Sequence, residues 1–255
     1  MVAVRADPAR SVRGGLAGGR EVDAALAIAT ERDAIGGYHY ADSDIGRGSG
    51  PLALRNDKGS MRARYVLESE RWEEMAGQSS FDNIDELFAL GVSALKLGDP
   101  PRAKAAYQEL VRASEPRMDA GLREQASILR LEIEALAAVM DGTPAVAWSK
   151  MDEAVTLQAK MPKPIGRPYP VKGADELYGE LLLEAGRASD AMGWFEKTLA
   201  RTPNRSRAVL GLARASLKAG QRDKAEKAYA QFLANWAEAD PALPEVAEAR
   251  AALGR

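Results

Sequence analysis

The residues that could do chemistry directly are concentrated in one short stretch near the start of the chain, YHYADSD. It holds the only histidine, His39, with Asp42 and Asp44 close behind it. Imidazole and carboxylate groups can bind a metal ion or transfer protons, but a metal site needs three converging ligands and a catalytic site needs a nucleophile with its base. A single histidine in a glycine-rich stretch supplies neither. We therefore predict no catalytic residue, no metal site and no cofactor, and keep an enzyme or metal-binding protein that uses the His39 stretch as an alternative.

Other chemistries lack the residues that they require. The chain has no cysteine, which excludes disulfides, thiolate zinc sites and thiol nucleophiles. No glycine loop followed by lysine and a hydroxyl residue is present to bind phosphates. Because 35 Lys and Arg nearly balance 37 Asp and Glu, the overall charge favours neither nucleic acid nor an anionic membrane. We expect no nucleic-acid partner.

Location is constrained by the absence of long apolar runs. No run approaches the roughly 20 apolar residues of a membrane span, and the first residues contain no apolar core of a secretory signal. We therefore expect no membrane insertion and a cytoplasmic location by default. Export stays open if Met1 is not the natural start.

The positions of small and large residues indicate a helical repeat. Hydrophobic residues make up 46% and aromatic residues only 6% of the chain, and the second half is rich in helix-forming residues. Gly186 and Gly220 are 34 residues apart, and so are Phe195 and Tyr229. A fixed period between about 20 and 50 residues is typical of solenoids, in which each unit buries its apolar face against its neighbours.

The same pattern extends upstream when the chain is aligned on its turn glycines. Each glycine is followed five residues later by an alanine and preceded seven residues earlier by a glycine or alanine; these turn glycines are Gly98, Gly142, Gly186 and Gly220. Two antiparallel helices approach closely only where both present small side chains, and a large residue then fills the space beside the contact.

This pattern resembles the tetratricopeptide repeat family, whose consensus has a large residue followed by Gly or Ala, a turn Gly, an Ala and then an aromatic. Three units carry it: Leu90, Gly91, Gly98, Ala103 and Tyr107; Tyr178, Gly179, Gly186, Ala191, Phe195 and Pro203; and Leu212, Ala213, Gly220, Ala225 and Tyr229. The unit around Gly142 departs from it, with Glu134 at an apolar position and Met151 at an aromatic one. The resemblance implies an all-α fold, an α-solenoid of antiparallel helical hairpins with a C-terminal capping helix.

Four parts follow along the chain. Residues 1–60 read as an irregular glycine-rich segment with one short helix, and helical pattern resumes at Met61. Residues 61–159 form degenerate hairpins, 160–171 a proline-rich joint, and 172–255 two regular repeats with a capping helix from Pro244 to Leu253. A proline-rich joint before the last two hairpins also resembles bacterial repeat proteins, many of them exported.

The resemblance implies a noncatalytic interaction or assembly scaffold that binds a protein or peptide in the groove lined by the first helix of each hairpin. Carried over residue by residue, the apolar half of this groove is Phe88, Val92, Leu95, Leu129, Leu136 and Met140. The charged half is Glu176, Glu180, Arg207, Arg214 and Lys218. An apolar surface beside charged stripes suits a helix or an extended peptide.

Two alternatives to this interpretation stay open. The apolar residues of the groove could be covered by the N-terminal part of the chain itself, with Glu180 facing Arg214 across neighbouring helices. The chain could also be a structural portion of a larger or exported bacterial protein. The residues that clamp a peptide carboxylate in chaperone-binding members of the family are absent, so we do not predict that ligand.

Overall fold

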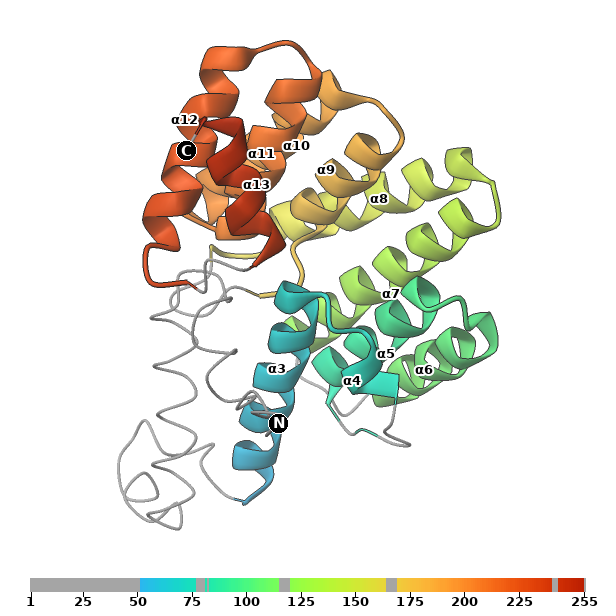
Figure 1. Cartoon of the computed structure of the whole chain (residues 1–255). Coiled ribbons are helices and arrows are strands. Elements are labelled where there is room, and N and C mark those ends of the chain that lie inside the picture. Colours follow the sequence, from blue (N-terminus) through green and yellow to red (C-terminus); the bar gives the residue numbers. More distant parts are fainter. Residues whose placement is uncertain are drawn as a thin grey trace, which may run out of the picture. The chain divides into compact units, whose positions relative to one another are not determined.

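The computed structural model describes residues 51–76, 81, 83–114, 120–163, 169–239 and 243–254. Within these ranges the chain forms eleven helices and no strand (Figure 1), which confirms the all-α fold class. His39, Asp42 and Asp44 lie outside the described residues, and so does the short helix expected in residues 1–60. The described residues divide into two compact units: a first unit that ends at Leu177 and a second unit that begins at Tyr178.

The first unit contains two hairpins preceded by a long helix. The long helix α3 packs against α5, α5 packs against α6 and α7, and α7 packs against α8. The helices are α3 (Pro51–Ser69), α4 (Glu73–Ala76), α5 (Ile84–Lys96), α6 (Pro100–Ala113), α7 (Ala120–Met140) and α8 (Pro144–Lys160).

Helix α3 begins at Pro51, ahead of Met61 where helical pattern was expected to resume, so the prediction that residues 51–60 are irregular is wrong. In the structure a Cβ atom at Gly59 would lie 2.5 Å from Oε2 of Glu86 on α5. The glycine therefore permits close approach of two helices and does not end one.

The second unit begins inside α9 and continues with two hairpins and a final short helix. Successive helices from α10 to α13 pack against one another. The helices are α9 (Ala174–Glu184), α10 (Ala188–Arg201), α11 (Ser206–Lys218), α12 (Arg222–Asn235) and α13 (Pro244–Ala252). Helix α13 lies where the capping helix was predicted, and its Val246 and Ala249 join the core formed by α11 and α12.

The four turn glycines have one common geometry. Each has a positive φ, between 68° and 78°, which other residues adopt at a cost. The residue after each glycine donates its backbone N–H at 2.8 Å to a carbonyl five residues earlier, as from Asp99 to Ala94 and from Gln221 to Ser216. This is the Schellman ending, and it satisfies carbonyls that the end of a helix leaves without partners.

The departure at Glu134 also has a physical reason. The hydroxyl of Tyr107 on α6 donates a hydrogen bond to the Glu134 carboxylate on α7, and Nζ of Lys150 on α8 lies 2.6 Å from Oε2 of the same group. Burial alone would raise the pKa of Glu134, but the hydrogen bonds and the charge of Lys150 lower it. A polar contact among three helices therefore replaces the apolar contact expected here.

In the second unit the tightest helix contacts surround Phe195, whose side chain is fully buried. A Cβ atom at Gly179 on α9 would lie 3.0 Å from the Phe195 ring, and one at Gly211 on α11 would overlap the ring. The ring thus fills the space that two glycines leave between three helices.

We expect Gly211→Ala to lower the free energy of unfolding. Overpacking costs about 1–3 kcal/mol, and the higher helix propensity of alanine offsets about 1 kcal/mol of it. Gly193→Ala is the matched control, because Gly193 also lies in a helix but nothing is within 4 Å of the added Cβ. Urea unfolding of both variants tests this contact. A Gly211→Ala protein as stable as the Gly193→Ala control contradicts it. Adding Phe195→Leu to Gly211→Ala should restore part of the lost free energy of unfolding.

Candidate functional site

The apolar half of the predicted groove is not an open surface in the described structure. Its members on α5 and α7 are between 0% and 5% exposed: Phe88, Val92, Leu95, Leu129 and Leu136. Only Met140, at the end of α7, is exposed, at 49%. The prediction of an exposed apolar patch is wrong because α5 packs against α3, α4, α6 and α7, while α7 packs against α5, α6 and α8. These side chains form the core of the first unit.

The charged half of the predicted groove is divided between core and surface. Glu176 is fully buried and lies 2.7 Å from Nζ of Lys172, which is also buried. Beside this pair the Gln158 carbonyl oxygen accepts a hydrogen bond from the backbone N–H of Ala174, and its amide donates to Asp175, both at 2.7 Å. These contacts attach the end of the proline-rich joint to α8 and α9, so Glu176 has a structural role.

Arg214 also bonds within the chain. Its guanidinium donates to both carboxylate oxygens of Glu248 on α13, with Nε at 2.9 Å and 3.1 Å and one terminal nitrogen at 2.6 Å. The alternative in which Arg214 faces Glu180 therefore gains no support, because the bonds of Arg214 go to Glu248. Arg207 on α11 is buried, and a terminal nitrogen of its guanidinium lies 3.5 Å from Oε1 of Glu245, which is on α13 like Glu248. Of the charged groove residues, Glu180 is partly buried and Lys218 is exposed.

The contacts at α13 shift the pKa values of Glu248 and Tyr229. Burial would raise the pKa of Glu248, but the hydrogen bonds and the charge of Arg214 lower it below its ordinary value. The hydroxyl of Tyr229 donates to Glu248 at 2.8 Å, and burial followed by this bond raises the pKa of Tyr229. The ionised carboxylate thus helps to hold α13 on α11 and α12.

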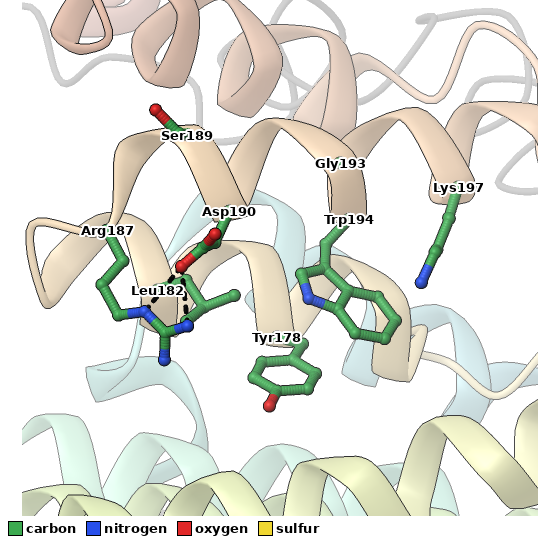
Figure 2. A pocket seen from close by; sticks show the side chains of 8 residues that line it. All are labelled: Tyr178, Leu182, Arg187, Ser189, Asp190, Gly193, Trp194 and Lys197. Atoms are coloured by element: carbon green, nitrogen blue, oxygen red, sulfur yellow. Dashed lines mark hydrogen bonds and ion pairs between the residues drawn. The ribbon is translucent and has the colours of Figure 1, made fainter.

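A different surface of the second unit forms a pocket of about 390 Å³ (Figure 2). From α10 it takes Asp190, Gly193, Trp194 and Lys197, which are spaced as one face of a helix. The opposite face of α10 is buried. Tyr178 and Leu182 of α9, together with Arg187 and Ser189, complete the lining. None of these residues is among those predicted for the groove.

Trp194 is held in place on both faces of its indole ring. The Tyr178 ring stacks on it with centroids 4.6 Å apart and planes 23° from parallel. Nζ of Lys197 lies 3.6 Å from the indole centroid, a cation–π contact. Figure 2 shows Tyr178 and Lys197 on opposite sides of the indole. The aromatic wall of the pocket is therefore ordered before any ligand arrives.

The charged residues at the rim of the pocket partly neutralise one another. Arg187 donates from Nε to Asp190 at 2.8 Å, and a terminal nitrogen lies 2.6 Å from the same oxygen. Lys197 has no carboxylate partner among the residues that the structure describes. The sequence signal that could have revealed this site is Gly193, which lies beside a tryptophan within a helix. Alanine at such a position would stabilise the helix by about 1 kcal/mol relative to glycine.

The described residues form neither a metal-binding cluster nor a membrane-spanning helix. No group of three or more His, Cys, Asp or Glu residues in the described ranges is placed to hold a metal ion. Among the described helices, none is both long enough and apolar enough to cross a membrane.

Two family models match the chain, and both are described as tetratricopeptide repeat. One matches residues 88–158 and the other residues 182–253. No curated protein and no solved structure matches the chain. The two matched regions contain the four turn glycines that share one geometry, whereas most of α9 precedes the second match.

We expect Glu248→Gln to loosen α13 at neutral pH. The lowered folded pKa of Glu248 means that its contribution is complete above the unfolded value of about 4.3 and disappears as the pH falls through the folded value. For a partly exposed ion pair the substitution lowers local stability by about 1 kcal/mol. This corresponds to roughly five-fold more frequent opening of α13. Hydrogen exchange of α13 amides should show this difference at pH 7, and the difference should decrease as the pH falls below the unfolded pKa of about 4.3.

The matched control is Glu226→Gln, which removes an exposed pair with Arg222 on α12 and should leave α13 unchanged. Equal protection of α13 in wild type and Glu248→Gln at pH 7 contradicts the role of the ion pair.

Proposed function

The protein belongs to the tetratricopeptide repeat family, and from this premise we propose that it is a noncatalytic module that binds a peptide segment of another protein at the α9–α10 pocket. Repeats of this family are generally protein–protein interaction modules and typically serve as noncatalytic scaffolds. The proposal retains the predicted class of partner but moves the contact away from the predicted groove.

The observation that carries the proposal is the fixed aromatic pair in an open pocket. Tryptophan, tyrosine and arginine are the residues that most often dominate binding energy at protein interfaces, and the pocket combines Trp194, Tyr178 and Arg187. Its volume of about 390 Å³ suits one or two side chains. Because Trp194 is already ordered, binding loses little side-chain entropy there.

Burial of the apolar groove residues also favours the α9–α10 pocket over the predicted groove as the binding site. Side chains such as Phe88 and Leu129, both 0% exposed, could contact a partner only after helices of the first unit separated. The α9–α10 pocket requires no such rearrangement. The alternatives of a structural portion of a larger protein, or of an enzyme that uses His39, gain no support from the described residues.

Site-specific photo-crosslinking tests the proposal. A photoreactive amino acid at Ser189, on the exposed rim of the pocket, should crosslink a discrete protein in cells of the source organism, and Trp194→Ala should reduce this product at least about ten-fold, as expected for a residue worth over 1.4 kcal/mol. The same amino acid at Ala230, exposed on α12, is the control.

A product at Ser189 that is absent at Ala230 and lost with Trp194→Ala supports the proposal. Identical products from both positions, or a Ser189 product that Trp194→Ala leaves unchanged, contradict it. Circular dichroism of the variant establishes that its helices are retained.

A further inference from the structure

We propose that the α9–α10 pocket selects a peptide in which an apolar side chain is adjacent to an aspartate or glutamate. The apolar side chain lies over Gly193, and the carboxylate binds Lys197. This inference rests on the proposed function and adds the chemistry of the ligand to it.

The position for the apolar side chain of the peptide is the space left by the missing side chain of Gly193. A Cβ atom at this residue would meet nothing within 4 Å, so the space above the helix is open. Leu182 and Tyr178, which border that space from α9, are 1% and 7% exposed and belong to the packed interior. An apolar group that enters there contacts aliphatic and aromatic carbon and leaves water, which favours binding.

The aromatic wall restricts how the ligand can lie. Both faces of the Trp194 indole are in use, one by Tyr178 and the other by Lys197. An incoming ring therefore has no free face on which to stack, and the pocket offers the indole edge. This arrangement favours a compact aliphatic side chain over a second stacked aromatic ring.

The charge of the rim indicates the neighbouring group. Arg187 and Lys197 carry two positive charges, and Asp190 carries one negative charge that is already bonded to Arg187. Lys197 has no carboxylate partner within the described ranges and places its ammonium against the indole. A carboxylate that joins it forms a charge-assisted hydrogen bond next to apolar surface, where such bonds are stronger than in bulk water.

The test uses an array of hexapeptides, acetylated and amidated so that no terminal charge remains. One set places Asp or Glu beside an aliphatic residue, and a matched set places Asn or Gln at the same position. We expect the full-length chain to bind the acidic set at least about ten-fold more tightly, since a carboxylate–ammonium contact contributes about 1.4 kcal/mol or more at this affinity ratio. Fluorescence anisotropy of the best acidic peptide gives the affinity in solution.

Two variants examine the two halves of the proposal. Lys197→Glu should weaken the acidic peptide at least about ten-fold and abolish the preference over its amide. Lys227→Glu, the same charge reversal at an exposed residue of α12, should change neither. Gly193→Leu should fill the space for the apolar side chain and weaken every peptide of both sets.

The outcomes separate this inference from the function on which it rests. If acidic and amide peptides bind equally while Gly193→Leu still blocks them, the carboxylate inference is overturned and peptide binding at the pocket stands. A further set repeats the amide peptides with a free C-terminal carboxylate; if only this set binds, a terminal rather than a side-chain carboxylate is recognised and the inference is likewise overturned. Binding that neither Lys197→Glu nor Gly193→Leu alters overturns both.

Discussion

The second unit depends on the packing of the Phe195 ring against the glycines of two neighbouring helices. Gly179 and Gly211 lie so close to this ring that a Cβ atom at either position would press on it. Because Phe195 is fixed on the buried face of α10, the residues on the other face are directed outward, among them Gly193 and Trp194. The packing that holds the helices together therefore also exposes the residues of the candidate site. No additional helix or loop is required to form it.

Charged residues in the described helices act mainly as connectors. Arg214 joins α11 to Glu248 of α13, and Lys172 joins Glu176 where the proline-rich joint enters α9. At the pocket Arg187 and Asp190 neutralise each other. Lys197 differs from these residues, since its described contact is with an aromatic ring. A charge that bonds only to a ring can gain more from a new partner than a charge already paired with a carboxylate.

Much of the fold could be predicted because its requirements are local. A turn glycine such as Gly98 is needed for a positive φ, and Gly91 leaves room for the end of the Ile133 side chain, which would lie 2.8 Å from an added Cβ. The site was harder to predict. The pattern of α5 shows that Phe88 faces something apolar, but it does not show that neighbouring helices supply the cover. In the same way Trp194 and Lys197 have the spacing of an ordinary solvated face, and their contact with Tyr178 exists only in three dimensions.

The face of α10 at the pocket is open while the apolar face of α5 is closed, and thiol labelling measures this difference directly. The chain has no cysteine of its own, so single cysteines can be introduced by near-isosteric changes, Ser189→Cys and Val92→Cys. Under native conditions the cysteine at 189 should react with a maleimide at the rate of a free thiol, and the cysteine at 92 at least about 100-fold more slowly, because it becomes accessible only on local opening. Comparable rates at the two positions would contradict the account.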